Sequence, residues 1–130
     1  MAAISWQHPV HAQDAGVLAV ELNKTEDTEA GCLSSFLFDN RTGYQLNRFQ
    51  LDLVFFDPEG IAEKQMLLDM APLYADKKSF ATFLVDDTAC DKIGSILVNG
   101  VPACENGSGH EIGCIDLLEV SSRSEVPLER

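Results

Sequence analysis

The feature that most constrains this chain is a strict alternation of apolar and polar residues near its middle. Within residues 49–56, positions 49, 51, 53 and 55 are apolar, whereas Gln50 and Asp52 lie between them. Successive side chains of a β-strand point to opposite faces, so a period of two predicts a strand with one buried face. The sequence Asp57-Pro58-Glu59-Gly60 that follows is typical of a tight turn. We therefore expect a half-buried strand that ends near residue 56.

Similar short apolar runs, separated by turn residues, recur along the rest of the chain. The expected strands cover residues 17–22, 32–39, 49–56, 79–85, 93–98 and 115–120. Turns are expected at 40–43 and at Asn99-Gly100, because Asn and Gly readily adopt positive φ values. Six or seven short strands at regular spacing predict an all-β fold, an antiparallel β-sandwich of about seven strands.

Residues 61–74 fit two interpretations. Apolar residues from Met66 to Tyr74 recur at helical spacing, which is typical of a short amphipathic helix. Pro72 is poorly placed in such a helix, because its ring removes a hydrogen bond and clashes with the preceding turn. The neighbouring segments are all expected strands. We therefore favour an extended segment at a sheet edge over a helix.

The length of 130 residues fits a single domain, which we expect to cover residues 14–122. Residues 1–13 are interpreted as a signal-peptide remnant or a disordered tail, since Val10 and Ala12 suit the −3 and −1 positions of a cleavage site. Residues 123–130 are mostly polar and are expected to form a flexible C-terminal tail. No apolar run approaches the ~20 residues that span a bilayer, so no membrane insertion is expected.

Four cysteines, an even number, are spread widely: Cys32, Cys90, Cys104 and Cys114. The sequence lacks the Cys-x-x-Cys spacing that zinc and thioredoxin-like sites use. Two structural disulfides in an oxidising compartment are the favoured interpretation, so the protein is expected to be periplasmic or secreted; four buried thiols are the alternative. Pairing is open between Cys32–Cys90 with Cys104–Cys114 and Cys90–Cys104 with Cys32–Cys114.

The charge of the chain is strongly acidic. Asp and Glu number 21 against 9 Lys and Arg, and the net charge is −12. Such a surface repels phosphates and anionic lipids, which argues against nucleic-acid binding. It favours solubility, a cationic ligand or a basic protein partner.

The residues that could carry catalysis are few. No nucleophile elbow, phosphate-binding loop or dinucleotide fingerprint occurs, so no enzyme activity and no cofactor are expected. His8 and His11 fall in the expected signal remnant. His110, Glu105 and Glu111 lie in a glycine-rich loop and are weak candidates for a metal site. A solvated loop histidine is the favoured interpretation.

Three segments within residues 17–86 share a recognisable pattern, and they read FLFDNRTGYQL, FQLDLVFFDPEG and APLYADKKSFATFLV. In these segments the middle of the chain resembles FxLYD-type immunoglobulin-like domains. The matching residues are Asn40, Thr42, Gly43, Phe55, Phe56, Asp57, Gly60 and Phe80. The FxLYD string itself is absent, and Ala75-Asp76 stands where the family has Pro-Gly. The later part is similar to uncharacterised exported proteins of alphaproteobacteria.

The resemblance implies an immunoglobulin-like, disulfide-stapled sandwich that acts as an accessory module without catalysis. Two functions are consistent with the sequence. The first is a noncatalytic exported module that binds a protein partner or has a structural role at the envelope, through a strand edge or loops. The alternative is a small-ligand or metal-binding protein that uses the 105–113 loop.

Overall fold

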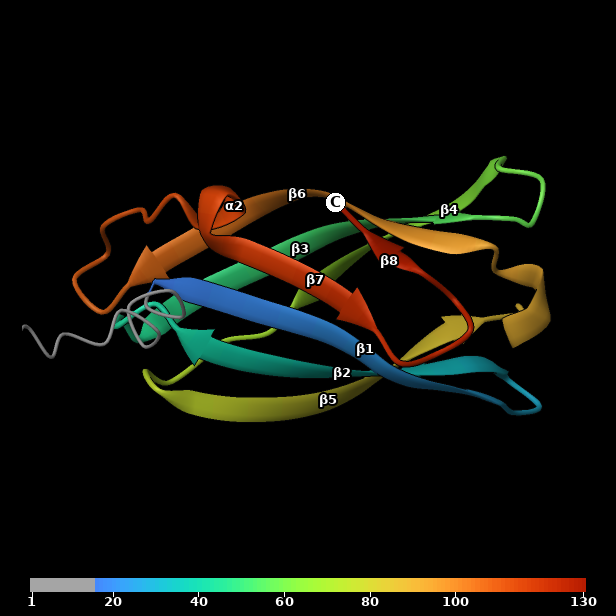
Figure 1. Cartoon of the computed structure of the whole chain (residues 1–130), viewed down its shortest axis with the longest axis horizontal. Coiled ribbons are helices and arrows are strands. Elements are labelled where there is room, and N and C mark those ends of the chain that lie inside the picture. Colours follow the sequence, from blue (N-terminus) through green and yellow to red (C-terminus); the bar gives the residue numbers. More distant parts are fainter. Residues whose placement is uncertain (1–15) are drawn as a thin grey trace, which may run out of the picture.

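The computed structural model describes residues 16–130, which form two four-stranded sheets that face each other (Figure 1). Sheet A has the order β5-β2-β1-β7, and sheet B has the order β4-β3-β6-β8. Sheet A consists of β1 (Val17–Asp27), β2 (Gly31–Arg41), β5 (Lys77–Asp86) and β7 (Leu118–Ser122). Sheet B consists of β3 (Leu46–Phe56), β4 (Ala62–Asp69), β6 (Ser95–Asn106) and β8 (Leu128–Glu129). A 3-10 turn, η1 (Cys90–Lys92), precedes β6, and a short helix, α2 (Cys114–Leu117), precedes β7.

The core lies between the sheets and is built from the alternating residues. In β3, Phe49, Leu51, Leu53 and Phe55 are buried, as the sequence pattern predicts. Phe38 of sheet A meets Phe49 of sheet B with ring centroids 6.1 Å apart and the rings at 82°. Such edge-to-face pairs add to the stabilisation that burial of two large rings provides. The chain is thus mostly β with one shared core, in agreement with the all-β prediction.

Asn40, near the end of β2, is a fully buried polar residue whose side chain is hydrogen-bonded through both of its polar atoms. Its amide nitrogen donates to the carbonyls of Tyr44 (2.9 Å), Leu73 (3.1 Å) and Tyr74 (3.2 Å). Its side-chain oxygen accepts hydrogen bonds from the backbone N–H and the hydroxyl of Thr42, at 3.1 and 2.7 Å. A buried amide without such partners is costly. Asn40 therefore ties the turn after β2 to the segment that leads into β5.

The extended interpretation of residues 61–74 is confirmed. Residues Ala62–Asp69 form β4, which pairs antiparallel with β3 at the edge of sheet B. Leu73 then pairs with Leu46 in an isolated bridge before the chain crosses to β5. The apolar residues at helical spacing are divided between a strand and the connection that follows it.

The turn predicted at Asn99-Gly100 is wrong. Strand β6 runs through both residues, and Gly100 lies opposite Asp52 of β3. The β3–β6 register is irregular on both sides of Asp52, so the glycine coincides with a local β-bulge. An Asn-Gly pair forms a tight turn only when its flanks pair with each other. Here both flanks pair with β3.

The prediction of a purely antiparallel sheet is wrong at the C-terminal end. Strand β7 pairs in parallel with β1, and β8 pairs in parallel with β6. Residues 123–130, predicted as a flexible tail, belong to the fold, because Val126 and Leu128 are buried in the core. Arg130 also donates to the carbonyls of Ile115 and Leu118, at 2.6 and 2.7 Å. The domain therefore extends beyond the predicted boundary at residue 122.

Both disulfides of the first predicted pairing are present. Cys32 of β2 is bonded to Cys90 of η1, with 4.9 Å between the Cα atoms. Cys104 of β6 is bonded to Cys114 of α2, with 6.2 Å between the Cα atoms. The first bond links sheet A to the segment that enters sheet B, and the second closes the glycine-rich loop.

Two predictions concern residues that the structure does not describe. The signal-peptide interpretation of residues 1–13 and the histidines His8 and His11 all lie outside the described range. Within residues 16–130, no helix is both long and apolar enough to cross a membrane.

Candidate functional site

The 105–113 loop contains the weak metal candidates, and its conformation is held by hydrogen bonds within the loop. The side-chain oxygen of Asn106 accepts hydrogen bonds from the backbone N–H groups of Ser108 and His110, both at 3.0 Å. Glu105 and Glu111 lie opposite each other in a single antiparallel bridge, and Glu105 accepts a hydrogen bond from Arg48 at 2.7 Å. Within residues 16–130, no group of three or more His, Cys, Asp and Glu side chains is placed to hold a metal ion. The metal hypothesis thus gains no support from this geometry.

An acidic groove of about 640 Å³ lies between the β3–β4 turn and the segment that contains η1. Its walls are Asp57, Pro58, Glu59, Glu63, Lys64, Asp87, Thr88, Ala89, Asp91 and Lys92. A second hollow of about 360 Å³ shares residues 87–89 with it and adds Asp27 and Glu29. Carboxylates outnumber lysines here, so this end attracts cations and basic side chains over a long range. The sequence offered no signal for it, because its carboxylates come from two segments, 57–64 and 87–92, that are distant along the chain.

Two carboxylates at this end of the molecule, Asp57 in the groove and Asp86 next to it, stabilise the local fold. Asp57 accepts hydrogen bonds from the backbone N–H groups of Ile61 and Glu59, each at 2.9 Å. These bonds, that of Ile61 above all, hold the pKa of Asp57 below its ordinary value. Lys64 donates to the carboxylate of Asp86 at 2.7 Å and so lowers the pKa of Asp86. Asp57 and Asp86 remain charged at neutral pH, which is unsuited to a general acid.

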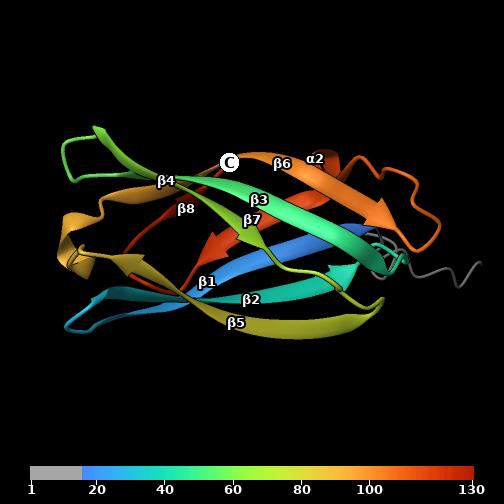
Figure 2. The same cartoon turned by 180° about the vertical axis from the view of Figure 1, so that it is seen from behind.

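Strand β5 offers a different kind of surface, because it forms an outer edge of sheet A (Figures 1 and 2). It pairs with β2 over ten residues without any register shift. Its even-numbered residues are exposed, and its odd-numbered residues from 79 to 85 are half-buried or buried. Phe80 is 55% exposed and Leu84 is 38% exposed. Two large apolar side chains therefore point outward from an edge strand.

The exposed apolar side chains of β5 continue onto β2. Leu37 lies opposite Phe80, and Leu33 lies opposite Leu84, on the outer face of sheet A. Between these pairs, the hydroxyls of Ser35 and Thr82 share a hydrogen bond at 2.9 Å. We call these six residues, together with the open side of β5, the β5 surface. It combines apolar side chains with the unpaired backbone of an edge strand.

The β5 surface differs from the other sheet edges of residues 16–130. Residues 79–85 of β5 contain no charged side chain and no proline, in a chain with a net charge of −12. The edge strand β4 carries Glu63, Lys64 and Asp69. The edge strands β7 and β8 have only five and two residues. Charges, bulges, prolines and short strands are the devices that normally protect an edge from pairing with another chain, and the middle of β5 lacks them.

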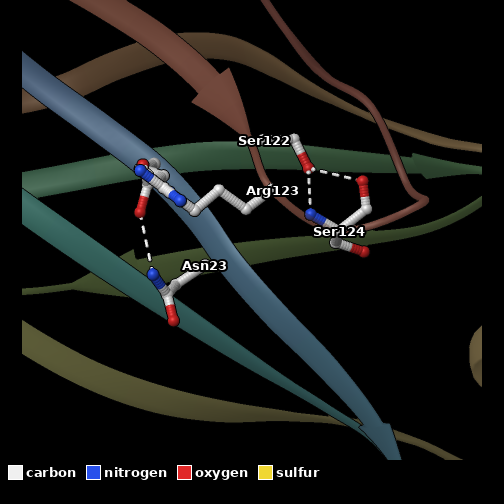
Figure 3. Close-up of polar contacts among 5 residues, drawn as sticks. Asn23, Ser122, Arg123 and Ser124 are labelled. Atoms are coloured by element: carbon white, nitrogen blue, oxygen red, sulfur yellow. Dashed lines mark hydrogen bonds and ion pairs between the residues drawn. The ribbon is translucent and has the colours of Figure 1, made fainter.

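Polar contacts gather near the opposite edge of sheet A, around the end of β7 (Figure 3). Beyond β7, Arg123 donates to Glu21 of β1 at 3.1 Å, and Asn23 donates to the same carboxylate at 2.8 Å. The Asn23 amide, followed by Arg123, lowers the pKa of Glu21. The hydroxyl of Ser122 accepts a hydrogen bond from the backbone N–H of Ser124 and holds the turn that leads to β8. The edge of sheet A at β7 is therefore short and flanked by charged and polar contacts, whereas the edge at β5 is long and uncharged in its middle.

Comparisons with protein-family models, with curated proteins and with solved structures find no match to this chain. The assignment of function therefore depends on the geometry described above.

Proposed function

We propose that this protein is a noncatalytic, exported β-sandwich module that binds a protein partner through the β5 surface. The observation that carries the proposal is the uncharged edge of residues 79–85, with Phe80 and Leu84 exposed beside it. An extended segment that adds to an open edge gains main-chain hydrogen bonds, and exposed side chains next to the edge provide specificity. Contiguous exposed apolar side chains are likewise typical of interaction sites.

An immunoglobulin-like relationship is part of this proposal. In immunoglobulin constant-type domains the second strand pairs with the fifth, and the third pairs with the sixth. The pairs β2–β5 and β3–β6 have the same order. A departure occurs at β7, which lies beside β1, whereas the seventh immunoglobulin strand lies beside the sixth. The Cys32–Cys90 bond, from the second strand to the entry of the sixth, supports the relationship.

Export to the periplasm or the outside of the cell is supported by the two disulfides, because such bonds persist in oxidising compartments. The test is the intact mass of protein recovered from its native host, with and without reduction. Two disulfides predict a mass gain of four hydrogens on reduction. Protein recovered with four free thiols would contradict export.

The test of partner binding places a photo-reactive phenylalanine analogue at position 80 of the full chain, expressed in its native host. The matched control places it at position 67, because Leu67 lies on the edge strand β4 and is also 55% exposed. We expect defined cross-linked adducts from position 80, and we expect that position 67 gives none of these same adducts. Adducts that are equal at both positions, or absent at position 80, would reject binding at the β5 surface.

A further inference from the structure

The exposed face of β5 has a sequence that is complementary to itself. Its outward residues, in order, are Lys78, Phe80, Thr82, Leu84 and Asp86. Read in the reverse direction, the same face presents an acid, an aliphatic residue, a threonine, an aromatic residue and a base. A strand with this order matches an antiparallel copy of itself.

From this order we propose that the partner of the β5 surface is a second copy of this chain, so the inference rests on the proposed function. The two β5 strands pair antiparallel about a two-fold axis at Thr82, which joins the two copies of sheet A into one continuous sheet. Lys78 of each copy then lies opposite Asp86 of the other, and Phe80 lies opposite Leu84. A two-fold interface of this kind uses the same patch on both copies.

The side-chain pairs in this register are all favourable. Residues directly opposite each other in an antiparallel pair have Cβ atoms about 4.5–5.5 Å apart, so Phe80 packs on Leu84 of the other copy. Lys78 and Asp86 form opposite-charge pairs at both ends of the interface. The side chain of Asp86 is 70% exposed even with Lys64 bound, which leaves it accessible to a second cation.

Neighbouring registers lose these pairs. A shift of two residues in one direction brings the charged Lys78 opposite the apolar Leu84. The same shift places Asp76 opposite Asp86, and these two side chains repel each other. A shift of one residue turns the outer face of one copy toward the core side of the other. The register centred on Thr82 is therefore strongly preferred, because it matches charge with charge and apolar side chain with apolar side chain.

The geometry also explains why self-association is directed to this strand. Each copy has a net charge of −12, so most of the surface repels a second copy. The β5 edge is uncharged over residues 79–85 and has Lys77 and Lys78 at its entry. Two copies therefore meet here with less repulsion than at β4, where Glu63 and Asp69 lie along the edge.

The first experiment measures the mass of the full chain by sedimentation equilibrium as a function of concentration, at about 0.15 M salt to screen the net charge. We expect twice the monomer mass of 14.2 kDa at high concentration. Thr82→Lys places two like charges together on the two-fold axis and is expected to give monomer. The matched control Leu67→Lys, on the exposed face of β4, is expected to leave the dimer intact.

The second experiment tests the register with charge reversals. Lys78→Glu and Asp86→Lys each place two pairs of like charges in the dimer, so each variant alone is expected to be monomeric. When the two variants are mixed, both pairs become opposite charges again. We expect the mixture to form a mixed dimer, and we expect the chain to remain folded by circular dichroism in each variant.

The outcomes separate the two proposals. A wild-type chain that stays monomeric at every concentration overturns the second copy as partner. In that case, cross-linking at position 80 to a different protein still upholds the proposed function. A dimer that survives Thr82→Lys, or a mixture of the charge variants that does not associate, also overturns this interface. If Thr82→Lys fails to fold, the mixing of the two charge variants alone tests whether the dimer forms through β5.

Discussion

At the scale of single residues, Asn40 shows how one buried side chain fixes the path of the chain. Its bonds reach the carbonyls of Leu73 and Tyr74, far along the sequence, as well as the nearby turn at Thr42. A buried amide that bonds to carbonyls from two segments is difficult to replace, because an apolar substitute removes a hydrogen bond from each of them. The carbonyl of Leu73 keeps the backbone N–H of Leu46 as a donor.

Replacement of Asn40 by alanine should therefore destabilise the fold by about 3 kcal/mol, since several carbonyls each lose a hydrogen bond. Urea unfolding followed by circular dichroism measures the change. The matched control is Asn99→Ala, because Asn99 is exposed and its side chain donates a hydrogen bond to the half-buried Asp52 on the same surface. We expect the control to change stability by less than ~0.5 kcal/mol. Equal losses in the two variants would refute the role given to Asn40.

Asp57 is the residue whose protonation we expect to affect the free energy of unfolding most directly, because its carboxylate accepts two backbone hydrogen bonds. Its pKa is held below the ordinary value of 3.8 in the folded chain, chiefly by the backbone N–H of Ile61. A lowered folded pKa contributes stability above the unfolded value, and this contribution is lost as the pH falls through the folded value. Asp52, whose pKa is lowered by bonds from Asn99 and Gln65, acts in the same direction.

The unfolding midpoint in urea should accordingly be nearly constant from neutral pH to pH ~5 and should fall below pH ~4. Asp57→Asn keeps an oxygen that can accept the two backbone hydrogen bonds but does not titrate. The variant should be less stable than wild type at neutral pH and should lose less of its stability between pH ~5 and pH ~3. If the unfolding midpoint of Asp57→Asn depends on pH as that of the wild type does, Asp57 contributes nothing to the pH dependence of stability.

At the scale of elements, β8 is the shortest strand, and it forms one edge of sheet B. Leu128 is 7% exposed, and its strand pairs with β6 at Ile96. We predict that Leu128→Ala lowers the free energy of unfolding by about 2–3 kcal/mol, the lower part of the range for a leucine removed from a core, because Leu128 lies at the margin of the core. Glu129→Ala, on the exposed position next to it, is the control and should be nearly neutral. A free energy of unfolding unchanged in Leu128→Ala would show that residues 128–129 act as a tail after all.

The strands that the sequence predicts correctly are those with clear alternation and clear turns. Residues 49–56 and 32–39 fall within β3 and β2, and 61–74 contains the edge strand β4. The errors occur where pairing is decided by distant residues. Asn99-Gly100 has turn chemistry but pairs with β3, and residues 123–130 look polar although Val126 and Leu128 are anchored by the rest of the core.

The β5 surface was only partly visible in the sequence. The period of two in residues 79–85 places Phe80 and Leu84 on the face opposite to Phe83 and Val85. Whether that face is covered depends on the order of the strands and on β5 lying at an edge, which no local pattern encodes. The acidic groove depends likewise on how two distant segments, 57–64 and 87–92, come together.

At the scale of the whole molecule, the two disulfides differ in how much of the chain they constrain. Cys32–Cys90 spans 58 residues, whereas Cys104–Cys114 spans 10. The entropy lost by the unfolded chain grows with the size of the closed loop, which gives about 4 kcal/mol for the first bond and about 3 kcal/mol for the second.

Urea unfolding of the paired variants C32A/C90A and C104A/C114A should follow this order. Each pair serves as the control for the other, because both remove two sulfur atoms from buried or half-buried positions. A larger loss of stability in C104A/C114A would show that local packing in the folded state, and not the size of the loop, determines the contribution.

The parallel pairing of β7 with β1 also sets the order in which sheet A can form while the chain is made. Leu18 emerges early and Leu118 late, yet the two lie side by side in sheet A. Contacts between residues so distant in sequence slow folding, and until residues 118–122 are available β1 presents a second open edge. A nascent chain must therefore keep both sides of sheet A unpaired for nearly its entire synthesis. Its strand edges are therefore open to pairing with other chains for longer than those of a protein built from consecutive hairpins.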